Sequence, residues 1–265
     1  MTCEVVGPDS GDLPPLVDVV NAVGAKTDVA GVALWSGGLP LFQEPLQAFA
    51  DNDIPIAIPH FYVDEGFYPG DVAVVSGDIE AGAADVAVAM CGDLEGQSGS
   101  VAVTQNGLNT TENTYSETFT ETMNTECPDI DVLPVELEGI DPAEAVAVAV
   151  GIMQANPDLI GAVSTTGGGG TTWALAQEQT NKQIVAYATD YTRENLALIE
   201  SGEITGVLAQ PVFEESRAAA GLLLQLSQGE TVEHWSKMPT VVVTEANLDE
   251  YLTLLDEVEA YADGL

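Results

Sequence analysis

Short apolar runs recur along the chain, and stretches of helical period separate most of them. The runs are Val29–Trp35, Ile54–Pro59, Val72–Ser76, Ser100–Gln105, Ile130–Val135, Ile160–Thr165, Gln183–Thr189, Ile204–Gln210 and Pro239–Thr244. Continuous apolar strands that alternate with amphipathic helices are typical of parallel sheets covered by helices on both faces. Because open sheets commonly hold fewer than about ten strands, the pattern predicts two smaller sheets.

Several helices are predicted between and after these runs. Leu16, Val19, Val20 and Val23 fall on one helical face. A second helix is expected to begin at Asp141-Pro142, because proline is favoured in the first turn of a helix. The stretches 211–228 and 248–261 have the same period, and the latter is acidic enough to predict a surface helix.

The charge balance excludes several function classes. The chain holds 43 Asp and Glu against 5 Lys and Arg, for a net charge of −38. Such a chain is repelled by nucleic acids and by anionic lipid surfaces. Disorder is also excluded, because 46% of the residues are hydrophobic and can build a core. We therefore expect a folded protein with an acidic surface, adapted to high salt, where screening makes self-repulsion tolerable.

Targeting and cysteine patterns add little. No apolar run reaches the roughly 20 residues that span a bilayer, and no signal-peptide pattern begins the chain. Cys3, Cys91 and Cys127 are too few and too scattered for a zinc site. They are read either as ordinary thiols or as one Cys91–Cys127 bridge. No metal or cofactor is expected.

Candidate chemistry follows the predicted strands, where ligands bind in sheets of this kind. The candidates at or near these ends are Trp35, His60, Phe61, Gly167, Trp173, Asp190 and Gln210. Aromatic rings, amides and a carboxylate suit a neutral polyhydroxy ligand. Each has a plainer alternative: the aromatics as core, the glycines of 167–170 as a tight turn, and Asp190 as a helix cap. Gly96-Gln97-Ser98-Gly99-Ser100 falls short of a hydrolase nucleophile elbow, so no enzyme is expected.

Four segments resemble the periplasmic sugar-binding proteins of the ribose-binding, LacI-like type (type 1) that serve ABC importers. DNDIPIAIPHFY (51–62) resembles the family's helix-to-strand step, and VVSGDIEAGAADVAVAM (74–90) resembles its hinge crossing, with Asp78 beginning the helix. ANPDLIGAVSTT (155–166) resembles the step into a later strand. IVAYATDYTRENLALIESGEITGVLAQP (184–211) resembles the family's ending. The order and spacing of the segments carry the resemblance over nearly the whole chain.

The resemblance implies two doubly wound parallel-sheet (Rossmann-like) α/β domains, joined by a three-crossing hinge, that close on a sugar. It places residues 1–77 and 211–241 in an N-terminal lobe and residues 78–210 and 242–265 in a C-terminal lobe. Asp190 matches an aspartate that pairs with sugar hydroxyls, and Gln210 matches a ligand-contacting glutamine at the hinge. Asn113 and Tyr115, from the helix at 112–123, join the candidate contacts.

This chain departs from the family pattern at several positions. It has His60-Phe61 in place of Asp-Arg, Tyr115 in place of an arginine, and Gly167-Gly168 in place of Asn-Asp. A sugar other than ribose, a polyol or another small polar molecule is therefore expected. The family's first strand and helix have no counterpart, and Glu4-Val5-Val6 followed by Pro8-Asp9-Ser10 resembles its second strand. We therefore expect an N-terminally shortened chain, an incomplete first sheet and a missing export segment.

Two functions follow from the resemblance. The first is an extracytoplasmic receptor, working with the membrane subunits of an ABC importer and not itself inserted in the membrane. The second is the effector-sensing domain of a LacI-type transcription regulator, which the charge of −38 disfavours.

Overall fold

The chain folds into two compact units. The computed structural model describes residues 3–8, 13–107 and 109–263. Unit 1 comprises Met1–Gly77 and Val212–Met238, and unit 2 comprises Asp78–Pro211 and Pro239–Leu265. The chain therefore passes from one unit to the other three times.

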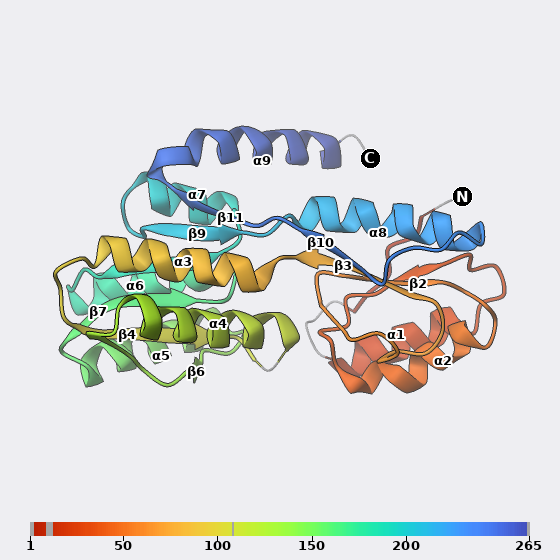
Figure 1. Cartoon of the computed structure of the whole chain (residues 1–265), viewed down its shortest axis with the longest axis horizontal. Helices are drawn as coiled ribbons and strands as arrows, with labels where there is room; N and C mark the ends of the chain where they lie inside the picture. The colour runs from red at the N-terminus through yellow and green to blue at the C-terminus, as the bar shows by residue number, and fades with distance from the viewer. Residues whose placement is uncertain (1–2, 9–12, 108, 264–265) are drawn as a thin grey trace. The chain divides into compact units, whose positions relative to one another are not determined.

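Unit 1 is built on a four-stranded parallel sheet. Its strands are β1 (Val32–Ala33), β2 (Ile56–Pro59), β3 (Val72–Gly77) and β10 (Trp235–Met238), in the order β1-β2-β3-β10. Helix α8 (Val212–Ser227) covers one face, and α1 (Leu13–Gly24) and α2 (Gln43–Ala50), the latter preceded by a short 3-10 turn (Pro40–Phe42), cover the other (Figure 1). Alternate strand residues point to opposite faces: Ile56 and Ile58 pack toward α1 and α2, and Ala57 packs toward α8.

Unit 2 is built on a larger sheet of order β11-β9-β8-β7-β4-β5, with β6 also pairing with β4. Its strands are β4 (Gly99–Gln105), β5 (Ile130–Val132), β6 (Glu136–Leu137), β7 (Leu159–Ser164), β8 (Val185–Thr189), β9 (Gly206–Ala209) and β11 (Val241–Thr244). All pairings are parallel except that of β11 with β9.

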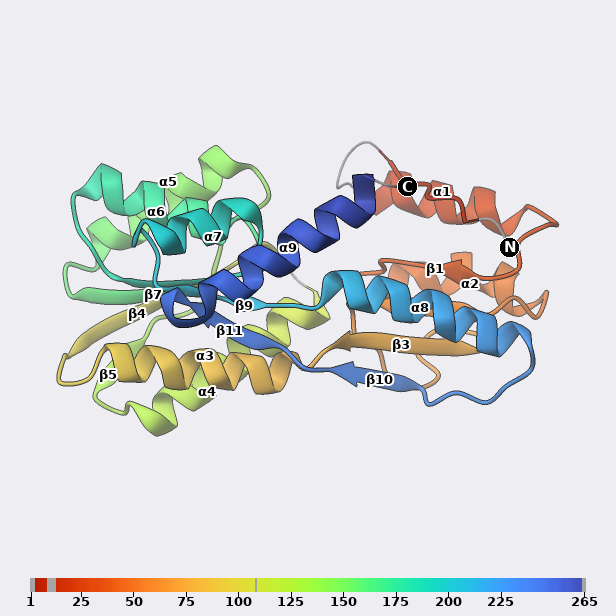
Figure 2. The same ribbon diagram turned by 90° about the horizontal axis from the view of Figure 1, so that it is seen from above.

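Helices cover both faces of this sheet (Figure 2). Helices α3 (Ile79–Asp93) and α4 (Thr110–Glu126) lie on one face, and α5 (Pro142–Ala155), α6 (Gly169–Thr180), α7 (Arg193–Glu200) and α9 (Leu248–Asp263) lie on the other. Val101 and Val103 of β4 pack under α3 and α4, while Ala102 between them packs toward α5 and α6. In β4, the larger valines therefore face α3 and α4, and the smaller Ala102 faces α5 and α6.

The predicted α/β fold with parallel sheets is confirmed, and each of the apolar runs overlaps a strand. Asp78 and Asp141 cap α3 and α5 by accepting hydrogen bonds from backbone N–H groups one turn later. The strand expected at Glu4–Val6 is wrong: residues 3–8 lie outside any helix or strand, and Val5 is 94% exposed because no neighbouring strand pairs with it. Asp9 and Ser10 lie outside the described residues.

A disulfide joins Cys91 of α3 to Cys127 at the end of α4. The two Cα atoms are 5.9 Å apart and 36 positions apart in sequence, and both cysteines pack against the apolar layer beneath the two helices. Cys3 is an exposed free thiol. Of the two alternatives for the cysteines, the structure has the bridge.

In the part of the chain that the structure describes, no helix has the length and apolarity needed to cross a membrane.

Candidate ligand-binding site

Two residues directly after parallel strands have a left-handed backbone. His60 follows β2 with φ of 74°, and Asp190 follows β8 with φ of 70°. Outside glycine this conformation is uncommon, although His, Asp and Asn tolerate it better than most residues. The other described examples, Asp53 and Asn181, follow helices instead. Backbone strain of this kind gathers at functional sites, and here it marks the strand ends where such sheets bind ligands.

In unit 1, these strand ends present a cluster of aromatic rings, which we call the unit 1 edge: Trp35, His60 and Phe61. The Trp35 and His60 rings are stacked, with centroids 4.8 Å apart and planes 10° from parallel. Phe61 meets both rings edge-on, at 5.8 Å and 4.8 Å. Trp35 is 46% exposed although large and apolar. An exposed, braced indole can lie against the apolar face of a sugar ring.

A buried carboxylate supports the unit 1 edge. Glu215, from the first turn of α8, is fully buried. Its Oε1 accepts a hydrogen bond from the Gly77 N–H at 2.6 Å, and its Oε2 lies 3.1 Å from His60 Nδ1. Glu215 could not be identified from the sequence, because an acidic residue at a helix N-terminus is ordinary and nothing in the sequence indicates its burial.

In unit 2, three predicted site residues come together after β7, β8 and β9. The Gln210 amide donates its Nε2–H to Asp190 Oδ1 at 3.2 Å. A Cβ on Gly167 would lie 2.8 Å from Asp190 Oδ2, so glycine is required for the carboxylate to take this position. Asn195 holds the loops together by donating to the carbonyl oxygens of Gly167, Thr189 and Asp190 at 2.9–3.0 Å.

The end of β4 and the start of α4 add an amide network. Gln105 donates from Nε2 to Asn113 Oδ1 at 3.1 Å and accepts from Ser116 Oγ at 3.0 Å. Glu112 accepts from the Asn106 N–H at 2.6 Å and from the Thr165 hydroxyl at 3.1 Å. Burial raises the pKa of Glu112, although these hydrogen bonds oppose the shift.

Glu138, after β6, is a second carboxylate that the sequence alone does not single out. Its Oε1 accepts from the hydroxyls of Ser164 at 3.0 Å and Thr166 at 2.6 Å. Among the described residues, Glu138 and Glu215 are the only buried acids; Glu138 directly follows β6, and Glu215 contacts Gly77 at the carboxyl end of β3. Glu138 Oε2 and Gln210 Oε1 are buried with no hydrogen-bond partner among the described residues. Buried acceptors of this kind are costly until a donor reaches them.

We use the name unit 2 edge for ten residues at or near the carboxyl ends of the unit 2 strands: Gln105, Glu112, Asn113, Glu138, Ser164, Thr165, Thr166, Gly167, Asp190 and Gln210.

Trp173 and Tyr115 lie in the core and not at either edge. Trp173 is fully buried and donates its Nε1–H to Thr104 Oγ1 at 3.3 Å. Tyr115 of α4 is 1% exposed in the apolar layer between α3, α4 and the sheet, and burial raises its pKa. Both rings fill the space between helix and sheet, so a ligand does not reach them in this structure.

Each of the five basic side chains either contacts a group of its own unit or is exposed. Arg193 pairs with Asp256 and Glu259 of α9 at 2.6 Å and 2.7 Å. Lys26 pairs with Glu4. The remaining three are Lys182, bonded to the Pro157 carbonyl, Lys237, over the Trp235 ring, and Arg217, exposed on α8. The charged side chains of the unit 2 edge are therefore all carboxylates.

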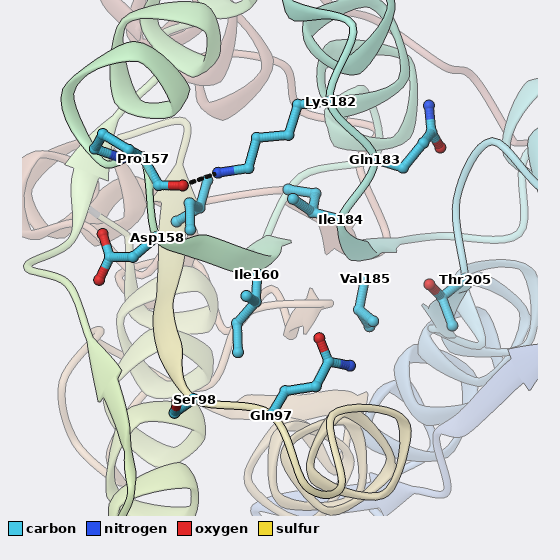
Figure 3. Close-up of a pocket in the computed structure, with 11 residues that line it drawn as sticks. Gln97, Ser98, Pro157, Asp158, Ile160, Lys182, Gln183, Ile184, Val185 and Thr205 are labelled. Carbon is cyan, nitrogen blue, oxygen red and sulfur yellow. Dashed lines mark hydrogen bonds between the residues drawn. The ribbon is translucent and has the colours of Figure 1, made fainter.

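A separate pocket of about 430 Å³ lies at the amino ends of the unit 2 strands (Figure 3). Gln97, Pro157, Lys182 and Thr205 are among its lining residues, and the Lys182 ammonium donates to the Pro157 carbonyl at 2.7 Å. Because these residues precede β4, β7, β8 and β9, the pocket is at the opposite end of the strands from the unit 2 edge.

Known proteins share the fold of this chain. The family model of the periplasmic binding protein domain matches residues 1–231. Among solved structures, the chain is similar to a glucose-galactose binding protein from Geobacillus stearothermophilus, with 19% identity over 92% of this chain and 86% of that one, and a TM-score of 0.81.

It is also similar to an ABC transporter solute binding protein from Agrobacterium vitis with bound D-fucose, with 21% identity, coverage of 92% and 84%, and a TM-score of 0.82. A third similar structure is a periplasmic solute binding protein from Actinobacillus succinogenes with bound D-allose, with 16% identity, coverage of 93% and 87%, and a TM-score of 0.83. At these identities the likeness is one of fold. No curated protein matches the chain in sequence.

Proposed function

Because the chain belongs to the periplasmic binding protein family, we propose that it is an extracytoplasmic solute-binding protein that delivers a sugar or similar polyhydroxy ligand to an ABC importer. The observation that carries the proposal is the chemistry of the strand ends. Unit 1 presents an exposed Trp35 ring stacked on His60, and unit 2 presents carboxylates and amides that accept hydrogen bonds. Rings for apolar faces and acceptors for hydroxyls are what a sugar needs.

The ligand in this proposal is neutral or cationic. Glu112, Glu138 and Asp190 give the unit 2 edge three carboxylates, and the nearby hydroxyls of Ser164, Thr165 and Thr166 already donate to Glu138 or Glu112. The unit 2 edge therefore has more hydrogen-bond acceptors than donors, and a ligand that supplies donors would complement it. A sugar supplies hydroxyl donors, whereas the carboxylate of a sugar acid would meet like charge.

The proposed ligand contacts come from both units. Unit 1 contributes Trp35, His60 and Phe61. Unit 2 contributes Asn113, Gly167, Asp190 and Gln210, together with Glu112 and Glu138. We take the two compact units as the two lobes of the family. Each edge contributes to ligand binding, and the hinge at the three connections converts binding into a shift between an open and a closed population.

The proposed location is outside the cytoplasm, in a salty medium. The Cys91–Cys127 disulfide supports an oxidising compartment, because disulfides persist there and are rare in the cytosol. A net charge of −38 supports a medium in which salt screens the repulsion between surface carboxylates. An exported receptor would meet such a medium directly.

The test is a binding screen on this chain, with sugars and polyols in molar salt. A ligand that binds only the native state raises the melting temperature, and calorimetry then gives the affinity. Stabilisation by at least one neutral sugar supports the proposal. Turnover of the bound sugar into a product would contradict a pure binding role.

A further inference from the structure

The two oxygens of Glu215 are both engaged, each by a different part of unit 1. Oε1 accepts the Gly77 N–H at 2.6 Å, and Oε2 contacts His60 Nδ1 at 3.1 Å. Glu215 itself is fully buried, and the His60 side chain is only 12% exposed. A carboxylate withdrawn from water requires hydrogen bonds of this quality to persist. The Glu215 carboxylate therefore fixes the positions of the Gly77 N–H and the His60 ring, and these two groups in turn fix the position of the carboxylate.

Glu215 lies close to two of the connections between the units. Gly77 is the last residue of unit 1 before the chain first leaves it, and α8 begins at Val212, where the chain returns. Within unit 1, the buried Glu215 side chain therefore links two of the segments that run between the units to the His60 ring. This ring stacks on Trp35.

We infer that Glu215 is a positioning residue for ligand binding: it fixes the orientation of the His60 ring against Trp35 and keeps the proton on His60 Nδ1. This inference rests on the proposed function, since the Trp35–His60 stack is the ligand surface of unit 1. Glu215 does not touch the ligand in this account and acts through His60.

The proton assignment follows from the partners. The Gly77 N–H can only donate, so Glu215 Oε1 is an acceptor. A carboxylate oxygen can only accept, so His60 Nδ1 is the donor in its contact with Glu215 Oε2 and carries the proton. In the neutral ring, Nε2 is then an acceptor, with its direction set by the stack on Trp35. Glu215 thereby decides which hydrogen-bonding character His60 presents.

An isosteric substitution inverts this arrangement. In Glu215→Gln, only one oxygen remains, and the Gly77 N–H requires it. The amide NH₂ then faces His60 Nδ1, which must become an acceptor, so the neutral ring moves its proton to Nε2. Size and burial are preserved, and only the polarity of one contact changes.

The experiment measures the ¹⁵N shifts of His60 in the unliganded protein and the affinity for a stabilising sugar, in wild type and in Glu215→Gln. The chain has two histidines, and His60→Asn identifies the signals of each. The matched control is Glu44→Gln, which removes an exposed carboxylate from the first turn of another unit 1 helix. A cooperative thermal transition in each variant establishes that it folds.

We expect the Nδ1–H form in wild type and in Glu44→Gln, the Nε2–H form in Glu215→Gln, and an affinity about tenfold weaker in Glu215→Gln alone. Unchanged His60 shifts, or a changed tautomer with unchanged sugar affinity, would overturn the inference. Since the shifts are recorded without ligand, an absence of sugar binding in wild type would count against the proposed function, while the tautomer result would still decide the role of Glu215 toward His60.

Discussion

The Gln210 side chain donates its Nε2–H to Asp190 Oδ1 at 3.2 Å, and this contact fixes the orientation of the Gln210 amide. Only a donor can face the carboxylate, so Oε1 is turned away, into a buried position where it has no hydrogen-bond partner among the described residues. Asp190 is held at φ of 70° and against Gly167 to make this contact. The pair is an arrangement that a ligand hydroxyl would complete.

Asp190→Asn tests the charge of this pair. Asparagine tolerates the left-handed backbone and its Oδ1 can still accept from Gln210, so the fold is retained while the negative charge is lost. We expect sugar affinity to fall by about 1.5 to 3 kcal/mol, the scale of a hydrogen bond to a charged group. Calorimetry measures the change, with exposed Asp131→Asn as control. Equal affinity in the two variants would remove Asp190 from the site.

Glu112 is predicted to cost stability as the pH rises. Burial raises its pKa in the folded state, so the folded protein holds its proton to higher pH than the unfolded chain. Below the unfolded pKa of about 4.3 both states are protonated and there is no cost. As the pH rises through the folded pKa, ionisation of the buried group destabilises the protein.

Relative to wild type, Glu112→Gln should therefore gain in melting temperature as the pH rises from about 4.3, the unfolded pKa, through the raised folded pKa of Glu112. Thermal unfolding across this range measures the difference. Exposed Glu117→Gln, in the same helix, should show no such trend. A difference between Glu112→Gln and wild type that is constant with pH would refute the burial argument.

Much of the fold could be predicted from sequence, because strands buried on both faces are apolar along their whole length. Strand β10 escaped prediction, since an edge strand such as Trp235–Met238 can include polar residues like Ser236 and Lys237. The opposite error arose at Glu4–Val6, where a short apolar stretch has no neighbour to pair with. Apolar character alone therefore does not make a strand.

The site was harder to predict. Gly167, Asp190 and Gln210 were identified by their places after strands, and the structure brings them together. Trp173, expected near a strand end, and Tyr115, expected from the family resemblance, lie in the core, because the sequence does not show whether an aromatic ring faces a ligand or packs between helix and sheet. Glu138 and Glu215 could not be distinguished among 43 acidic residues, since burial depends on tertiary packing.

The Cys91–Cys127 bridge should contribute substantially to stability. Closing a loop over a sequence separation of 36 residues restricts the unfolded chain by about 4 kcal/mol in the chain-entropy model. The double variant Cys91→Ser, Cys127→Ser should unfold at clearly lower urea concentration, and reductant should lower the wild type toward the same midpoint. Cys3→Ser is the control, because Cys3 is exposed and unbridged. Equal midpoints for wild type and the double variant would argue against a stabilising bridge.

Salt should stabilise the protein strongly. With 43 acids and 5 bases, repulsion between surface carboxylates opposes folding, and raising the ionic strength from about 0.1 M to about 1 M shortens the screening length from about 10 Å to about 3 Å. We expect the melting temperature to rise steadily with potassium chloride over this range. A flat or falling curve would contradict adaptation to high salt.

Binding of a neutral sugar is tested most directly by calorimetric titration of the chain, in molar potassium chloride, with the neutral sugars that a thermal-shift screen selects. Each neutral sugar should be paired with its corresponding sugar acid. We expect saturable binding of at least one neutral sugar, with the affinity lost or strongly weakened for the acid form of that sugar and in Asp190→Asn. Failure of every neutral sugar to bind, or tighter binding of a sugar acid, would contradict the proposed function.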